Sequence, residues 1–130
     1  MRISKSVTAE IGHRLLNYNG KCNRLHGHSY KFTVTVEGEI DQYSGMVMDF
    51  RDLKDRINSI VRFWDHRMIL QTGDPIISHI NRSEIVVFDK PPTAENMAKH
   101  LFVSLRSQGL SVVSVIVRET STSTAEVTNG

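Results

Sequence analysis

The segment 22–28, with the sequence CNRLHGH, brings one thiol and two imidazoles close together in the chain. The segment 30–37 that follows alternates apolar and polar side chains, which predicts a strand. Because side chains alternate between the faces of a strand, His26 and His28 share one face if the strand begins at or before His26. Two neutral imidazoles on one face provide half of a zinc site.

A metal at this position needs at least one further protein ligand, and His13 is the natural candidate. It ends the first predicted strand, and an antiparallel hairpin would place it beside His26 and His28. Three imidazoles with an open fourth position form a catalytic zinc site, in which the metal polarises a substrate hydroxyl or carbonyl oxygen. The alternative is two ordinary histidines on an exposed strand face; Gly27, which allows close backbone approach, and the nearby Cys22 favour the metal site.

Cys22, the only cysteine, has two chemical interpretations. It could act as a base or nucleophile whose pKa is lowered by a neighbouring cation, or it could be the fourth ligand of a closed structural zinc site. A buried inert thiol is disfavoured because Cys22 lies between the polar residues Lys21 and Asn23.

Four other polar residues have ordinary structural explanations when each is taken alone. Asp65 and His66 follow a predicted helix, where a solvated end accommodates a histidine favourably. Glu119 ends an apolar strand and would be exposed there, and Glu95 lies in the first turn of a helix, where acidic residues are favoured.

Apolar periodicity predicts two helices and four strands. Leu53 and Ile57 recur at helical spacing after Asp49, a typical helix N-cap. Thr93 holds the same place before the second helix, and Gly109 is typical of a helix end. The expected elements are strands at 3–11 and 26–39, a loop at 15–24 with turn residues at 17, 19 and 20, a helix from 49 to 65, a helical turn near 74–79, a strand at 83–88, a helix from 93 to 109 and a strand at 111–119.

This order of elements indicates an α+β fold, with a mostly antiparallel four-stranded sheet and two helices packed on one face. Residues 1–120 are expected to form a single domain, and the Ser/Thr-rich segment 121–130 a flexible C-terminal tail. The edges of such a sheet are open, and association with other copies would cover them.

Composition narrows the classes of partner. The net charge of +2, with no long run of Lys and Arg, gives no indication of a nucleic-acid partner. No apolar run is long enough to cross a membrane, and the N-terminus lacks a signal core, so we expect a cytoplasmic protein without a membrane partner. A single cysteine excludes an internal disulfide, which fits a reducing compartment.

Six segments in order resemble the 6-pyruvoyltetrahydropterin synthase and 6-carboxytetrahydropterin synthase family, which has the tunnelling (T-) fold. The HGH triplet alone is a weak signal, but the six together cover nearly the whole chain. They are 12–15 (GHRL), 22–28 (CNRLHGH), 45–50 (GMVMDF), 65–67 (DHR), 92–96 (PTAEN) and 117–120 (VRET).

The resemblance implies a metal site and a base. His13, His26 and His28 would hold Zn²⁺, and Cys22 would remove a carbon-bound proton from the side chain of the substrate. Coordination of a substrate hydroxyl acidifies the adjacent C–H, and a thiolate beside the metal can then accept the proton.

The resemblance also implies roles in proton transfer and substrate binding. His66, oriented by Asp65, would be the proton-transfer partner of the base. Glu119 would bind the amino-pyrimidine edge of a pterin through two parallel hydrogen bonds, and family accounts also group it with the proton relay. Thr93 and Glu95 match the segment that borders the pterin pocket.

The spacing between the cysteine and the HGH triplet separates two branches of the family. The pyruvoyl branch typically has a longer spacing, whereas only three residues (Asn23, Arg24 and Leu25) intervene here, as in the carboxy branch. The resemblance therefore implies conversion of 7,8-dihydroneopterin triphosphate to 6-carboxy-5,6,7,8-tetrahydropterin, acetaldehyde and triphosphate, an early step toward queuosine and other 7-deazaguanines. The alternatives are 6-pyruvoyltetrahydropterin synthesis with triphosphate elimination, side-chain cleavage by a pterin aldolase, and a non-catalytic pterin- or zinc-binding module.

Family members join their sheets edge to edge into a barrel with active sites at subunit boundaries, which implies a homo-oligomer, a hexamer of two stacked trimers. The chain departs from the family pattern at Trp64, where leucine is common, and in the segment 67–71, which lacks an asparagine often found there. These departures affect substrate preference more than chemistry.

Overall fold

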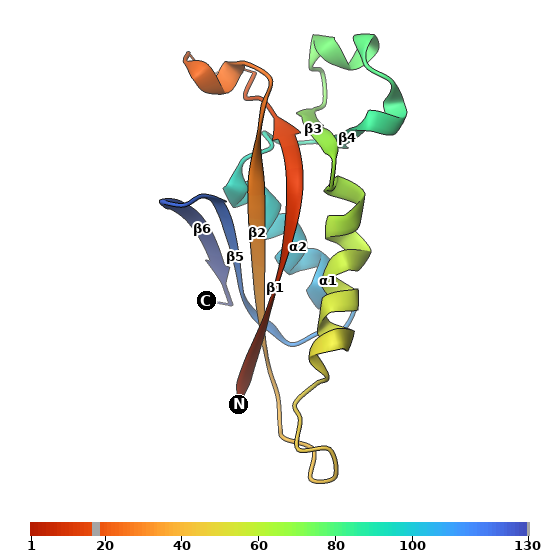
Figure 1. Ribbon diagram of the computed structural model, residues 1–130, viewed down its shortest axis with the longest axis vertical. Helices are drawn as coiled ribbons and strands as arrows, with labels where there is room; N and C mark the ends of the chain where they lie inside the picture. The colour runs from red at the N-terminus through yellow and green to blue at the C-terminus, as the bar shows by residue number, and fades with distance from the viewer. Residues whose placement is uncertain (17–18, 130) are drawn as a thin grey trace.

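The computed structural model describes residues 1–16 and 19–129, which form a six-stranded sheet with two helices packed on one face (Figure 1). The strand order is β4-β3-β1-β2-β5-β6. The strands are β1 Arg2–His13, β2 His26–Glu37, β3 Arg67–Gln71, β4 Ile85–Phe88, β5 Val112–Thr120 and β6 Ser123–Thr128. The helices are α1 Phe50–Trp64 and α2 Ala94–Ser107, with the short 3₁₀ turns η1 Lys21–Asn23, η2 Pro75–His79 and η3 Arg82–Glu84.

The α+β class and the helices on one face are confirmed, but the expectation of four strands is wrong. The strand β3 pairs with β1 and β4 in parallel, so the sheet is mixed. The segment Arg67–Gln71 follows α1 almost directly and is too short for its alternation to be recognised. Of the loop expected at 15–24, part forms η1, and position 17 lies outside the described residues.

The expected flexible tail is also corrected, because Ser123–Thr128 forms β6 and pairs antiparallel with β5. Ala125 and Val127 pack against the core, whereas the alternating positions Thr124, Glu126 and Thr128 are exposed. A composition rich in Ser and Thr therefore concealed an alternating strand.

Both predicted helix starts are confirmed by their caps. The Asp49 carboxylate accepts a hydrogen bond from the backbone N–H of Arg51 at 2.7 Å, and the Thr93 hydroxyl accepts one from the N–H of Asn96 at 3.1 Å. The buried faces of α1 and α2 cover the sheet, and among the described residues no helix is both long and apolar enough to cross a membrane.

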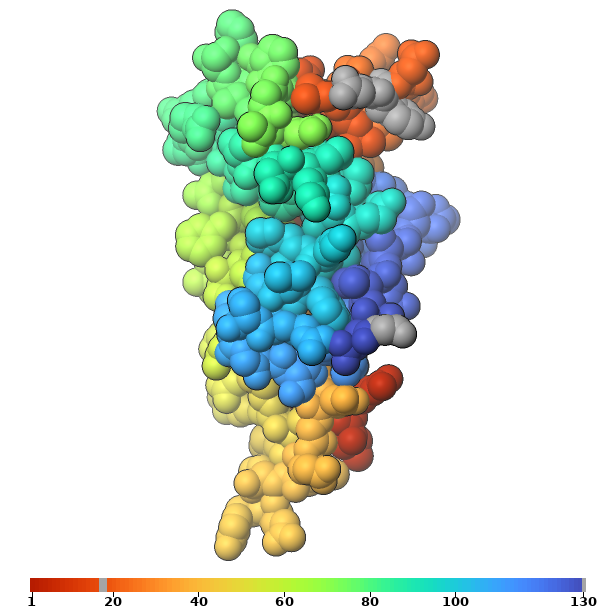
Figure 2. Space-filling model, turned by 180° about the vertical axis from the view of Figure 1, so that it is seen from behind, coloured from red at the N-terminus to blue at the C-terminus, as the bar shows by residue number. Residues whose placement is uncertain are grey.

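The β1–β2 hairpin places the predicted metal ligands together. Its register sets His13 opposite His26 and Ile11 opposite His28. The three histidines lie on the same face of the sheet as the core residues Tyr30 and Phe32, near the end of the hairpin. The opposite end of the molecule carries the projecting segment 38–48 (Figures 1 and 2), where the Tyr43 side chain is fully exposed.

A buried ion pair fixes the chain just after His13. The Arg14 guanidinium donates from Nε to Oδ2 of Asp74 at 2.7 Å and from Nη2 to Oδ1. Asp74 also caps η2 by accepting from the N–H of Ile76 at 3.0 Å. These contacts tie the end of β1 to the segment after β3, and the hydrogen bonds from Arg14 hold the pKa of Asp74 below its usual range.

We expect Asp74→Asn to lower the free energy of unfolding by about 3 kcal/mol at pH 7. The Asp74 side chain is fully buried, whereas that of Arg14 is 20% exposed. The expected loss of stability is therefore at the low end of the range for breaking a buried ion pair. Because the folded-state pKa is lowered, the stabilisation is present above the unfolded pKa of about 3.9 and is lost as the pH falls through the folded value. Urea denaturation between pH 7 and pH 3 measures this, with the exposed Asp55→Asn as control; a difference that stayed constant with pH would contradict it.

Candidate active site

Three histidines form a compact cluster at the end of the β1–β2 hairpin. Their ligand nitrogens all lie within 4.8 Å of one another, and the Nε2 atoms of His13 and His26 are 3.1 Å apart. His13 is buried, with 3% of its surface exposed, whereas His26 and His28 are partly accessible. The predicted ligand set is therefore brought together, with an open side toward solvent.

Backbone carbonyls fix the tautomers of two of these rings. Nδ1 of His13 lies 2.6 Å from the carbonyl oxygen of Pro92, and Nδ1 of His26 lies 2.7 Å from that of Arg24. A carbonyl oxygen only accepts, so both Nδ1 atoms carry a proton, and in the neutral rings both Nε2 atoms present lone pairs. Burial lowers the pKa of His13, and the neighbouring His26 lowers it further. The hydrogen bond to the Pro92 carbonyl raises this pKa, but the net shift is downward, so the ring stays neutral.

The donor set fits a zinc ion. Two lone pairs that face each other at 3.1 Å repel unless a cation lies between them. Zinc–nitrogen bonds of about 2.0–2.1 Å in a tetrahedron place the nitrogens roughly 3.4 Å apart, close to this separation. Carbonyl acceptors behind the rings are the usual second layer of such a site.

The Glu119 carboxylate lies beside the histidine cluster. Its Oε1 is 3.6 Å from Nε2 of His13 and 3.7 Å from Nε2 of His28, and it accepts a hydrogen bond from the Tyr30 hydroxyl at 3.2 Å. Burial, and then the charge of Glu119, raises the pKa of Tyr30, so the phenol keeps its proton. Glu119 is not within the group of mutually close ligand atoms, which contains the three histidines.

A cavity of about 500 Å³ joins two of the predicted substrate-binding residues. Glu119 and Glu95 line it together with Ala98 of α2, and residues of β6 close its other side. Thr93 is not part of this lining; its hydroxyl caps α2 and so positions the turn that carries Glu95.

Asp65 and His66 form a pair after α1, as predicted. Asp65 Oδ1 lies 3.0 Å from Nδ1 of His66 and accepts the backbone N–H of Glu10 at 2.8 Å. That bond from Glu10, followed by the His66 side chain, lowers the pKa of Asp65. His66 has a positive φ of 61°, and its own N–H donates to the Glu10 carbonyl at 2.6 Å. The carboxylate thus orients the imidazole through Nδ1, and the His66 side chain is 76% exposed.

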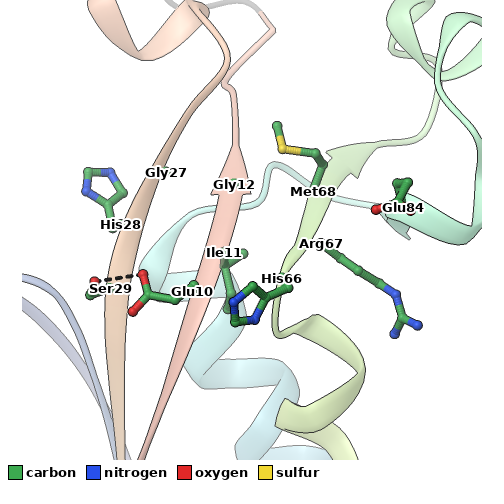
Figure 3. A pocket seen from close by; sticks show the side chains of 10 residues that line it. All are labelled: Glu10, Ile11, Gly12, Gly27, His28, Ser29, His66, Arg67, Met68 and Glu84. Atoms are coloured by element: carbon green, nitrogen blue, oxygen red, sulfur yellow. Dashed lines mark hydrogen bonds between the residues drawn. The ribbon is translucent and has the colours of Figure 1, made fainter.

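A second cavity, of about 450 Å³, is lined by both His66 and the predicted ligand His28 (Figure 3). Glu10 and Ser29, joined by a 2.7 Å hydrogen bond, lie between them. No hydrogen bond or ion pair connects Asp65 or His66 to the histidine cluster within the described part of the chain. The side chains of Glu10 and Ser29 lie on the exposed face of the hairpin, opposite the face that carries the three histidines, so this cavity borders that exposed face.

Cys22 lies in η1, above the end of the hairpin, and is partly exposed. Its sulfur does not belong to the group of mutually close ligand atoms. The turn that carries it directly precedes β2, the strand of His26 and His28. This placement suits a group beside the metal site better than a fourth ligand of a closed one.

Sequence reasoning missed several residues that shape the site. Tyr30 contacts Glu119, the Pro92 carbonyl fixes His13, and the backbone of Glu10 holds Asp65. Tyr30 had a usable signal, because it continues the two-residue period of His26 and His28 on one strand face. The contacts of Pro92 and Glu10 use backbone groups, which nearly every residue has, so the residue types in the sequence do not indicate them.

Comparison with known proteins places this geometry in a family. The family model described as 6-pyruvoyl tetrahydropterin synthase matches residues 2–130. A Halobacterium salinarum protein named probable 6-carboxy-5,6,7,8-tetrahydropterin synthase is 36% identical over 128 residues, covering 93% of this chain and 82% of its own. The 6-carboxy-5,6,7,8-tetrahydropterin synthase of Haemophilus influenzae is 33% identical over 136 residues, covering 96% of each chain.

Solved structures share the fold over the whole chain. An uncharacterized protein from Wolinella succinogenes superposes with a TM-score of 0.84 at 27% identity, covering 100% of this chain and 98% of its own. The 6-pyruvoyl tetrahydropterin synthase of Caenorhabditis elegans superposes with a TM-score of 0.76 at 24% identity, covering 100% and 96%. The resemblance inferred from the six segments is confirmed, and the chain belongs to the 6-pyruvoyl tetrahydropterin synthase family.

Proposed function

We propose that this protein is a zinc-dependent lyase, a 6-carboxy-5,6,7,8-tetrahydropterin synthase that acts on 7,8-dihydroneopterin triphosphate. Its main support is the set of histidine nitrogens that converge beside Glu119, at the edge of a cavity large enough for a small ring system. The names of the relatives from Halobacterium salinarum and Haemophilus influenzae, and the short spacing between Cys22 and the HGH triplet, favour the carboxy branch.

Separate residues would bind the metal and the substrate. A divalent cation held by His13, His26 and His28 would polarise a side-chain oxygen of the substrate. Glu119 would hold the amino-pyrimidine edge of the pterin through two parallel hydrogen bonds, with Glu95 and the α2 turn capped by Thr93 at the border of the pocket.

Proton transfer would use two groups that are not metal ligands. Cys22 would accept the carbon-bound proton, since a nearby positive charge favours the thiolate. His66 would deliver or accept the second proton through Nε2, because Asp65 occupies its Nδ1 at 3.0 Å. Two groups with separate positions allow a proton to leave one carbon and return at another.

Product identification tests the proposed function directly. Zinc-loaded protein is incubated with 7,8-dihydroneopterin triphosphate, and the products are identified by mass. Acetaldehyde and a carboxylated tetrahydropterin support the proposal, and such a product would feed the synthesis of queuosine or other 7-deazaguanines. A pyruvoyl product would assign the chain to the other branch of its family, and 6-hydroxymethyl-dihydropterin to a pterin aldolase. Pterin binding without turnover would indicate that the chain is a non-catalytic pterin-binding module.

We also propose that the chain forms a homo-oligomer, a hexamer of two stacked trimers with active sites at subunit boundaries. The outer edges of β4 and β6 have no partner strand among the described residues, and open edges of this kind are usually covered. Sedimentation velocity at micromolar concentration should show a species near six times the chain mass of 14.7 kDa. Sedimentation of monomers alone under these conditions would contradict the proposal.

A further inference from the structure

Tyr30 lies in β2 on the same face as His26 and His28, and no part of it is exposed. Its ring stacks on Phe32 with centroids 6.0 Å apart and meets the rings of His13 and His28 edge-on at 5.9 and 5.5 Å. Close packing on several sides allows the ring essentially one orientation. The position of the hydroxyl is therefore set by the core.

The hydroxyl has one acceptor suited to its proton. It lies 3.3 Å from both ring nitrogens of His13, so it is aligned with the lone pair of neither. Nδ1 of His13 already donates to Pro92, and Nε2 faces His26. The remaining partner is Oε1 of Glu119, at 3.2 Å, which accepts the bond.

The bond from Tyr30 is the shortest contact of Glu119 Oε1, which lies farther, at 3.6 and 3.7 Å, from Nε2 of His13 and of His28. It lies near the end of β5, its side chain is 28% exposed, and among the described residues Tyr30 is its only hydrogen-bond donor. A carboxylate has about four acceptor sites, so one bond to Tyr30 leaves the others for a ligand. A glutamate with several rotatable bonds loses much of its freedom when one oxygen is held by a rigid donor.

We propose that Tyr30 is a positioning residue: its buried hydroxyl holds the Glu119 carboxylate in the orientation that binds the pterin edge. This inference rests on the proposed function, because it takes a pterin as the ligand of Glu119. It assigns Tyr30 to substrate binding through Glu119, and leaves the metal ligands independent of the hydroxyl.

The test compares Tyr30→Phe with Tyr43→Phe, which removes the same hydroxyl from a fully exposed side chain. Binding of neopterin, followed by its fluorescence, should weaken about tenfold in Tyr30→Phe and stay unchanged in Tyr43→Phe. In turnover, KM for the triphosphate substrate should rise by a similar factor with kcat nearly unchanged, because Glu119 holds the pterin in both the ground state and the transition state. Zinc content and the visible spectrum of the Co²⁺-substituted protein should match those of wild type.

A double variant separates this role from general damage to the core. Glu119→Gln should weaken neopterin binding, and adding Tyr30→Phe should cause little further loss, because the hydroxyl acts through Glu119. If the losses in neopterin binding of the two single variants multiply in the double variant, the inference is overturned. It is also overturned if Tyr30→Phe binds neopterin as wild type does but has a changed Co²⁺ spectrum, because the hydroxyl would then act on His13. A wild type that neither binds neopterin nor turns over would overturn the proposed function and this role together.

The wild-type chain provides a measurement that does not depend on the folding of Tyr30→Phe. With labelled tyrosine, NMR should detect a slowly exchanging hydroxyl proton on Tyr30 that moves upfield in Glu119→Ala. A Tyr30 hydroxyl resonance that is unaffected by Glu119→Ala would show that the bond is absent in solution and would overturn the inference.

Discussion

A His13→Ala variant should lose its zinc and at least about 10³-fold of its kcat/KM. His13 is the most buried of the three histidines, and it is hydrogen-bonded to a segment outside the hairpin through the Pro92 carbonyl. Its removal leaves two imidazoles, fewer than the three protein ligands of a catalytic zinc site. Zinc content measured by mass spectrometry, together with turnover of 7,8-dihydroneopterin triphosphate, tests the expectation.

The matched control is His79→Ala, which removes an exposed histidine of η2 outside the cluster. It should retain about one zinc per chain and wild-type turnover. Chelator treatment of wild type should reproduce the loss of activity seen in His13→Ala, and added Zn²⁺ should restore it. A His13→Ala protein that kept both its zinc and its turnover would show that the metal is held elsewhere.

Cys22→Ala should keep its zinc and lose about 10²–10⁴-fold of kcat, the usual contribution of a general base. The reason is positional: the sulfur lies outside the group of three mutually close histidines, in the turn η1 that directly precedes the strand of His26 and His28. The measurement pairs zinc content and thermal unfolding with single-turnover kinetics. Cys22→Ser retains a polar group of similar size and should fold as wild type while recovering little of the rate.

The opposite outcome has an equally clear meaning. If Cys22→Ala loses its zinc and unfolds, the thiolate is a structural ligand and the metal has no open position for a substrate. The closed structural site considered from the spacing alone would then be the correct interpretation, and the proposed mechanism would lose its base.

The sequence alone determined the parts of this protein that depend on local geometry. His26 and His28 had to share a face because strand side chains alternate, and Asp49 and Thr93 capped helices where predicted. The pairing of His13 with His26 followed from reading the two strands as one antiparallel hairpin.

Only the tertiary structure decided the contacts between distant segments. The parallel placement of β3 and β4, and the addition of β6 to the sheet, depend on which edges and apolar faces remained to be covered. The bond from Tyr30 to Glu119 spans 89 residues, and the bond from His13 to Pro92 spans 79 and uses a backbone carbonyl common to every residue type. Local periodicity fixes which face a side chain occupies, whereas the packing of whole elements fixes which side chain it meets there.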